Sequence, residues 1–243
     1  MARSRKTLGI LAGVTVLVLA IVGFGAWWFF IRDDAPKSAN LADAQETLDQ
    51  QESGSSDDPA SGVDGTWNVD TTVGSFSDFS STWAGYRVKE QLASIGANTA
   101  VGRTPNVSGS MTIDGNSVTA VDVDVDLTTL QSDSGQRDAA MHGRGLQSDQ
   151  FPKATFSLTE PVQLPESIGG SVSATATGEL TIHGVTKPVT VDVQADVSGN
   201  TAAVVGQAPI ALSDYGIEAP TGFSVLSIDD QGTFEFQIFF TKA

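Results

Sequence analysis

The stretch "GELTIHGVTKPVTVDVQADV", Gly178 to Val197, contains two runs of alternating apolar and polar residues joined by a polar turn. Leu180 and Ile182 share one parity before the turn, and the apolar residues after it do the same: Val189, Val191, Val193, Ala195 and Val197. Alternation with a period of two is typical of a β-strand that buries one face. The stretch therefore predicts a hairpin with one apolar and one polar face.

The same alternation recurs at spacings of roughly ten residues, with turn residues such as "DGNS" between the runs. The apolar members are Met111 and Ile113; Val121, Val123, Val125 and Leu127; Ala154, Phe156 and Leu158; Phe234, Phe236, Ile238 and Phe240; and, less regularly, Trp83, Tyr86 and Val88. This pattern predicts an all-β protein with an antiparallel sheet, as a sandwich or a barrel. A barrel of about eight strands would leave no exposed edges, and its interior is just wide enough to be filled by side chains or to hold one small ligand. A short helix is expected in the loop Ser134 to Leu146.

Composition and charge restrict the possible functions. The chain has 243 residues, no cysteine and a formal net charge of −16. The negative charge begins at Asp33 and would repel phosphate backbones, so nucleic acid is not an expected partner. The absence of cysteine excludes disulfides, thiolate nucleophiles and cysteine-based metal sites.

An apolar run of 24 residues, Leu8 to Ile31, precedes the acidic part of the chain. As a helix it would be about 36 Å long, enough to span a bilayer. A signal peptide is the alternative, but its apolar core is usually about 7–15 residues and ends at a small-residue cleavage site, whereas this run ends in "WWFF". We expect an uncleaved anchor. Basic residues lie before the run, so the N-terminus is predicted to be cytoplasmic and the C-terminal domain extracytoplasmic.

Four segments follow from these patterns: a basic tail (1–7), a transmembrane anchor (8–31), a flexible acidic linker (32–63) and a β-barrel domain (64–243). The linker is poor in bulky apolar side chains, so we expect a disordered spacer that lifts the domain off the membrane. Within it, "NLADAQETLDQQ" is compatible with a short helix.

Catalytic and metal motifs are missing. The chain has no G-x-S-x-G and no H-E-x-x-H, and its two histidines, His142 and His183, are distant in sequence. Asp122, Asp124, Asp126 and Asp133 imitate the acidic positions of a calcium loop, but Leu127 stands where that loop needs glycine. We therefore expect no enzyme, no metal and no cofactor, and interpret the three strand aspartates as a solvated face.

His183 begins the turn "HGVTK", on the polar side of its strand. Gly184 permits a positive φ, and Pro188 is expected to end the turn. A structural role for this histidine is favoured over contact with a ligand headgroup, and both over catalysis.

Several motifs in order carry a family resemblance: "TWNVD" (66–70), "RD" (137–138), "GLQSDQFPKATF" (145–156) and "GELTIHGVTKPV" (178–189). Together they resemble the YceI-like family of extracytoplasmic lipocalin-like proteins that bind polyisoprenoid or other long-chain amphiphiles, over about residues 65–242. The resemblance implies an antiparallel barrel with an apolar tunnel and no catalytic residues. The chain departs from the family at "SDQFP", which retains only Asp149 and Phe151 of a D-F-F-D type motif, and at Ala140 and Met141, where many members have "H-L".

We therefore predict a membrane-anchored binding protein that holds a long-chain apolar ligand, such as a polyisoprenoid, an isoprenoid quinone or a fatty-acid-like amphiphile. The predicted lining is Val121, Val123, Val125, Phe156, Leu158, Leu180, Ile182, Val191, Val193, Phe234, Phe236 and Ile238. The candidate headgroup contacts are Arg137, His142, Arg144 and His183. The alternative is a non-enzymatic envelope interaction domain whose barrel core is packed and whose acidic outer face meets a partner. The two differ in whether the interior is hollow or filled.

Overall fold

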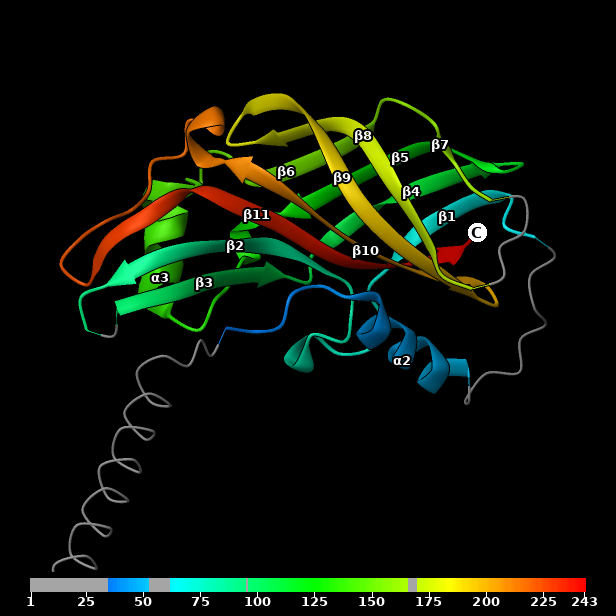
Figure 1. The fold of residues 1–243 in the computed structure, drawn as a ribbon, viewed down its shortest axis with the longest axis horizontal. Coiled ribbons are helices and arrows are strands. Elements are labelled where there is room, and N and C mark those ends of the chain that lie inside the picture. The colour runs from blue at the N-terminus through cyan, green and yellow to red at the C-terminus, as the bar shows by residue number, and fades with distance from the viewer. Residues whose placement is uncertain (1–34, 53–61, 95, 166–169) are drawn as a thin grey trace, which may run out of the picture.

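The computed structural model describes residues 35–52, 62–94, 96–165 and 170–243. Within them, eight antiparallel strands form a closed ring in the order β1-β4-β5-β6-β8-β9-β10-β11, and β11 pairs with β1 to close it (Figure 1). These strands are β1 (Gly65–Asp70), β4 (Val107–Asp114), β5 (Ser117–Asp126), β6 (Lys153–Leu158), β8 (Val172–Ile182), β9 (Val185–Ser198), β10 (Thr201–Ala211) and β11 (Val225–Lys242). The prediction of an all-β antiparallel barrel of about eight strands is confirmed.

The longest strand, β11, has two partners along one edge. Its last residues pair with β1, and its first part pairs with β2 (Trp83–Leu92). A further strand, β3 (Gly96–Thr104), pairs with β2, and the short β7 (Val162–Gln163) pairs with β5. The β2–β3 hairpin therefore extends the barrel wall at the end where β11 begins.

A short helical segment covers the same end of the barrel, where it lies behind β2 and β3 in Figure 1. It consists of α3 (Gly135–Ala140) followed by the π-helical turn η3 (Met141–Gly145). The Ser134 side chain caps α3 by accepting a hydrogen bond from the backbone N–H of Arg137. This confirms the helix expected in the loop Ser134 to Leu146.

The β8–β9 hairpin has a two-residue turn. His183 and Gly184 both have positive φ, 54° and 75°, as the tight hairpin turn with matching twist requires. The expectation that Pro188 ends the turn was wrong, because Pro188 lies within β9 opposite Glu179. The pairing of β9 with β10 starts only at Asp192, so the proline occupies a stretch of β9 whose second edge β10 does not pair.

A second difference concerns the expected flexible linker. Residues Leu41–Glu52 form the helix α2, which packs on the outside of the barrel against β9 and β10. Leu41, Ala44 and Leu48 share one helix face and are buried against Val73, Ala203, Val205 and Phe239. This part of the chain is therefore attached to the barrel wall instead of forming a spacer, because its three buried apolar side chains meet an apolar patch on the outer face of the sheet.

The predicted span, Leu8 to Ile31, and the basic tail before it lie outside the described residues. Among residues 35–52, 62–94, 96–165 and 170–243, no helix is long and apolar enough to cross a membrane. The four segment boundaries given above stay predictions.

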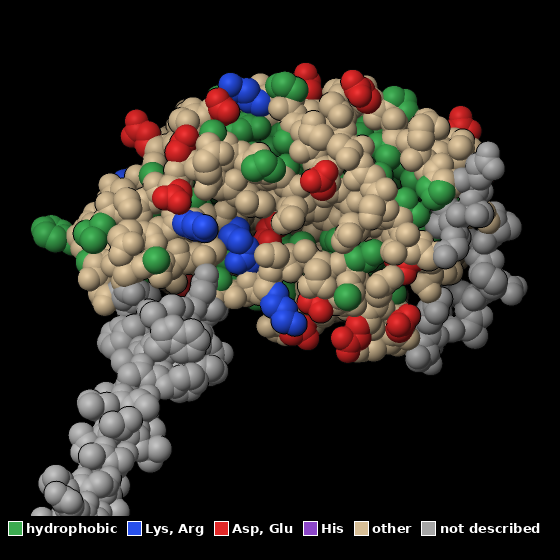
Figure 2. Space-filling view, in the orientation of Figure 1, with side chains coloured by type: hydrophobic (Ala, Val, Ile, Leu, Met, Phe, Trp, Pro, Cys, Tyr) green, Lys and Arg blue, Asp and Glu red, His purple; other side chains and the backbone are tan. Residues whose placement is uncertain are grey.

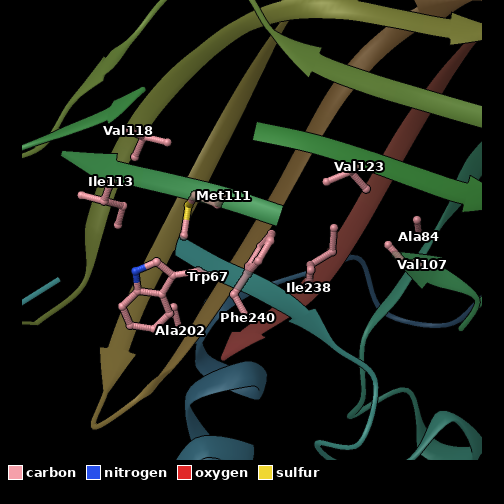
Figure 3. Close-up of a cluster of buried hydrophobic side chains, with 10 residues drawn as sticks. All are labelled: Trp67, Ala84, Val107, Met111, Ile113, Val118, Val123, Ala202, Ile238 and Phe240. Atoms are coloured by element: carbon pink, nitrogen blue, oxygen red, sulfur yellow. The ribbon is translucent and has the colours of Figure 1, made fainter. Parts of the chain in front are cut away.

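One end of the barrel interior is packed by side chains from several strands. Figure 3 shows Trp67, Met111 and Phe240 close together in this cluster, with Ile113 and Val118 beside them. The indole of Trp67 is fully buried, and its Nε1 donates a hydrogen bond of 2.8 Å to the carbonyl oxygen of Val63. This end lies opposite the end that α3 covers. Its strand β1 pairs with the last residues of β11, whereas α3 covers the end where β11 begins.

Candidate ligand-binding cavity

A cavity of about 670 Å³ runs through the barrel. Its wall includes residues of β2, β5, β6, β8, β9, β10 and β11, and these side chains are mainly aliphatic and aromatic. Ligand sites in proteins typically have volumes of about 300–1,000 Å³. The cavity is therefore large enough for a small ligand, and its wall offers mostly hydrocarbon.

All of the lining residues predicted from the alternation face this cavity: Val121, Val123, Val125, Phe156, Leu158, Leu180, Ile182, Val191, Val193, Phe234, Phe236 and Ile238. The sequence therefore predicted correctly which face of each of these strands points toward the barrel interior. Their role in holding a ligand stays a prediction. The alternative of a packed barrel core does not match a hollow of this size.

The interior stays open partly because large rings lie against the wall beside glycines. Three such pairs occur on neighbouring strands: Tyr86 with Gly102, Phe156 with Gly178, and Phe236 with Gly206. A Cβ placed on Gly206 would lie only 2.5 Å from Cζ of Phe236. The glycine thus provides the space in which the ring lies, so the ring does not have to project into the centre of the barrel.

Polar groups enter the wall at the end covered by α3. Arg137 of α3 donates from Nη2 to Oε1 of Glu90 on β2 at 2.6 Å, and Tyr86 lies two inward positions earlier on β2, with Val88 between them. Burial by itself would lower the pKa of Arg137, but the hydrogen bond and the charge of Glu90 outweigh it and raise that pKa. Burial also raises the pKa of the Tyr86 phenol, so this group is neutral at pH 7. These three residues form a polar end in an otherwise apolar cavity.

The "RD" pair noted in the sequence positions this end. Asp138 accepts hydrogen bonds from the backbone N–H and the hydroxyl of Ser132, at 2.8 and 2.6 Å. The guanidinium of Arg137 also contacts the carboxylate of Asp133. Asp138 therefore fixes the loop, and Arg137 reaches the cavity.

The cavity opens to solvent at this same end. Gln136, Arg144 and the residues Thr221–Ser224 line it and are also exposed at the surface. A Cβ on Gly145 would lie 3.8 Å from Cδ of Pro220, so the end of η3 and the β10–β11 connection border one mouth.

Of the four candidate headgroup contacts, Arg137 and Arg144 line the cavity, whereas His142 and His183 do not. His142 Nε2 donates to the carbonyl oxygen of Leu130 at 3.0 Å, and its Nδ1 accepts from the hydroxyl of Ser148 at 2.6 Å. His183 Nδ1 donates to the carbonyl oxygen of Tyr215 at 3.0 Å. Both histidines therefore hold loops in place, which matches the structural role favoured for His183, and neither lies where a headgroup contact in the cavity would be.

The "FP" and "HG" motifs meet on the outside of the barrel. The ring of Phe151 lies 4.4 Å from that of His183, measured between centroids, and a Cβ on Gly184 would collide with it. Two motifs that are 32 residues apart in sequence thus form one packing unit, which ties the loop before β6 to the β8–β9 turn.

Sequence reasoning missed Glu90, Tyr86 as a polar wall group, and the segment 219–225. A signal for Glu90 was present, because it shares the parity of Tyr86 and Val88 and so had to face inward. No pattern marked the segment 219–225, since all of it except Val225 at the start of β11 lies outside the strands.

The described residues contain no group of three or more His, Cys, Asp or Glu placed to hold a metal ion. The aspartates of β5 are engaged on the outer face, where Asp124 pairs with Lys153 and Asp122 accepts from Ser157. That the chain is no enzyme stays a prediction.

The sequence model of the YceI-like domain matches residues 65–240, from the start of β1 to two residues before the end of β11. The chain belongs to the YceI-like family. Among curated relatives, a UPF0312 protein of Vibrio campbellii is 30% identical over 136 residues, covering 52% of this chain and 69% of that protein. A UPF0312 protein of Shewanella oneidensis is 31% identical over 137 residues, covering 53% of this chain and 69% of its own.

Solved structures show the same fold. A polyisoprenoid binding domain from Saccharophagus degradans superposes with a TM-score of 0.56 at 16% identity, covering 73% of this chain and 98% of its own. BcnA of Burkholderia cenocepacia gives a TM-score of 0.52 at 19% identity, with 65% of this chain and 95% of that chain covered. The resemblance read from the motifs is thus confirmed.

Proposed function

We propose that this chain is a binding protein that holds one long-chain apolar molecule inside its barrel. The observation that carries the proposal is the apolar cavity of about 670 Å³, bordered by side chains from strands all around the barrel. Each methylene group moved from water into such a wall contributes about 0.8 kcal/mol, so eight of them give about 6 kcal/mol before the cost of association. Hydrocarbon burial alone therefore provides affinity without a headgroup contact.

The arrangement of polar groups favours an amphiphile over a plain hydrocarbon. Tyr86, Glu90 and Arg137 lie at the end covered by α3, while the wall at the opposite end includes Trp67 and Phe240. A polar headgroup at the first end and a tail reaching toward Trp67 match this wall. The ligand classes that fit are a polyisoprenoid, an isoprenoid quinone and a fatty-acid-like amphiphile, and the family neighbour that is a polyisoprenoid binding domain supports the first of these.

Photo-crosslinking tests this proposal on the full chain in phospholipid vesicles. Two versions of a long-chain amphiphile carry a photoreactive diazirine, one at the tail end and one beside the headgroup. Mass spectrometry of digested protein should find the tail label on peptides that contain Trp67, Met111 or Phe240, and the headgroup label near Arg137. Labelling confined to residues 8–31, with none on barrel strands, would contradict the proposal.

A matched pair of variants on β5 provides the control. Val123→Trp places an indole in the cavity, whereas Asp122→Trp places it on the outer face one residue away. Crosslinking inside the barrel should be strongly reduced in the first variant and retained in the second. Equal labelling of both would mean that the ligand does not occupy the lumen.

The proposed location is the outer side of the cell membrane, with the chain anchored once and its N-terminus in the cytoplasm. The apolar run Leu8 to Ile31 and the basic residues before it support this. Because the chain has no cysteine, single cysteines report topology directly. Asn200→Cys should react with a membrane-impermeant maleimide on intact cells, and Ser4→Cys should not. The reverse pattern would overturn the orientation, and a mature N-terminus beyond residue 31 would show a cleaved signal peptide.

A further inference from the structure

The connection between β10 and β11, together with the first residues of β11, carries the two large hydrophobic side chains that are most exposed in the described part of the chain. Phe223 is fully exposed, at 105% of its reference area, and Leu226 is 59% exposed. Figure 2 shows hydrophobic side chains at the surface of the end where β11 begins in Figure 1. Single exposed apolar residues are ordinary, so this pair becomes informative only through its position.

That position is the mouth of the cavity. The residues Ala219–Val225 line the cavity, Phe223 included, and Ile228 continues the lining along β11. An apolar surface therefore leads from the outside of the molecule into the hollow. A ligand with a long hydrocarbon tail partitions into membranes and not into water. Such a surface would let the ligand move between a membrane and the cavity with little exposure to water.

The described N-terminal segment is attached to β2 and β3, the hairpin that extends the barrel wall at the end where the mouth lies. Arg87 on β2 donates from Nη2 to the carbonyl oxygen of Pro36 at 2.6 Å, and Arg103 on β3 donates to that of Lys37. Glu235, buried at 1% exposure, accepts from both arginines and holds the pair in place.

This attachment limits how far the mouth can be from a membrane. The predicted span ends at Ile31, five Cα steps before Pro36, which corresponds to about 18 Å at full extension. Along β2, Arg87 is five residues from Leu92, and Leu92 pairs with Val225, so the mouth lies roughly 17 Å farther along the wall. The two distances are similar, and the mouth is therefore within reach of the bilayer surface.

Charge indicates which kind of membrane surface fits. The exposed acids Glu218 and Asp229 flank the segment, the exposed Arg144 lies at the same mouth, and the chain as a whole is anionic. Anionic lipids would be repelled, so contact depends on the apolar side chains and suits a zwitterionic phospholipid surface.

We propose that the segment 219–226 is a membrane-docking tip, in which Phe223 and Leu226 enter the interface of a phospholipid bilayer and the ligand passes beside them into the barrel. The passage of ligand rests on the proposed function. The docking itself requires no ligand and is tested separately.

Docking is tested by site-specific fluorescence on the full chain in phosphatidylcholine vesicles. Phe223→Cys, the only cysteine in the chain, is labelled with an environment-sensitive fluorophore, and a quencher is attached to the lipid acyl chains. The control is Asn200→Cys in the β9–β10 turn, at the opposite end of the barrel. The label at position 223 should lose most of its emission to the quencher, and the label at position 200 should keep it. Equal emission at the two sites would overturn the proposal. Energy transfer between labels at position 223 of two chains, without quenching by lipid, would also overturn it, because it would show that the patch is a contact between two copies of the chain.

Ligand passage is tested by the rate at which a fluorescent fatty acid moves from donor vesicles into the full chain. The double variant Phe223→Ser with Leu226→Ser should slow the transfer by about tenfold and leave the final amount bound unchanged. The matched variant Glu218→Gln with Asp229→Asn should not slow it. An unchanged rate in the serine variant would contradict the role of the tip. Absence of any uptake by the parent chain would instead contradict the proposed function, while the quenching result would still decide the docking.

Discussion

The two faces of β11 have opposite roles. Phe234, Phe236 and Ile238 face the barrel interior, where they border a cavity. Glu235, Gln237 and Phe239 alternate with them on the outer face, yet they are only 1%, 3% and 0% exposed. In a barrel with a filled lumen the interior would be the tightly packed side. Here the outer face of this strand is packed, and the inner face borders the hollow up to the packed end of the interior around Trp67 and Phe240.

The outer packing comes from segments outside the ring. The helix α2 covers Phe239, and the Gln237 amide donates to the carbonyl oxygens of Phe79, Ser80 and Ser81 in the loop before β2. Side chains that line a void lack contacts on one side, so a hollow lumen provides less dispersion stabilisation than a filled one. The comparison indicates that the outer layer supplies stability where the inner layer leaves room for a ligand.

The largest expected effect is the loss of outer packing. Phe239→Ala removes a fully buried ring and should lower the free energy of unfolding by about 3–5 kcal/mol, measured by urea denaturation. The folded fraction should still bind a long-chain probe with the same stoichiometry, because the ring does not line the cavity. A loss below about 1 kcal/mol would mean that the outer layer is not the main packed core.

The charged part of the outer layer comes next. Glu235→Ala leaves Arg103, which is 3% exposed, without the carboxylate that it contacts at 2.9 Å, and we expect a loss of about 3 kcal/mol. Arg103 also stacks on Trp83, with 3.8 Å between Cζ and the ring centroid, so a change in tryptophan fluorescence should accompany the loss. The exposed Glu179→Ala is the control and should change stability by less than about 0.5 kcal/mol. If the two variants are equally stable, the buried cluster of Glu235 with Arg87 and Arg103 does not stabilise the fold.

A glycine on the inner face tests the hollow directly. Gly206→Ala places a methyl group in the space of the Phe236 ring and forces the ring toward the lumen. Overpacking of this kind should cost roughly 1–3 kcal/mol, and the amount of bound probe should fall as well. The double variant Gly206→Ala with Phe236→Leu should recover binding, since the smaller side chain restores the space. Unchanged probe binding in the single variant would show that the position of the Phe236 ring does not determine how much space the cavity offers to a ligand.

The smallest effect is expected at Asp70, where β1 takes over from β2 as the partner of β11. Burial would raise the pKa of this carboxyl, but hydrogen bonds from Thr72 and Thr241 outweigh it and lower the pKa below its ordinary value. A lowered pKa in the folded state means that ionised Asp70 stabilises the fold above about pH 4, and that this contribution is lost as the pH falls further. Asp70→Asn should therefore lose less than about 1 kcal/mol at pH 7 and nothing near pH 2. A pH-independent difference between the variant and the parent would assign the effect to packing.

The strands that sequence reasoning missed are those covered on both faces. β10 reads "TAAVVGQAPIA", without clean alternation, because Ala203 and Val205 on its outer side are buried under α2 while Ala202 and Val204 face the interior. β3 has the same character, since Arg103 on its outer side is buried by Trp83 and by Glu235. The helix α2 was compatible with its sequence, but its attachment to the barrel was hard to predict, because only three of its twelve residues are buried apolar side chains and they form a narrow stripe.

The sequence by itself determined which residues alternate, and therefore which side chains of β5, β6, β8, β9 and β11 share the inner face. It also determined the order of motifs that identifies the family. Only the tertiary structure decided that the inner face encloses a hollow and that the segment 36–52 lies against the barrel wall. The physical reason is that parity is a local property of each strand, whereas free volume depends on how all rings and glycines of neighbouring strands pack together.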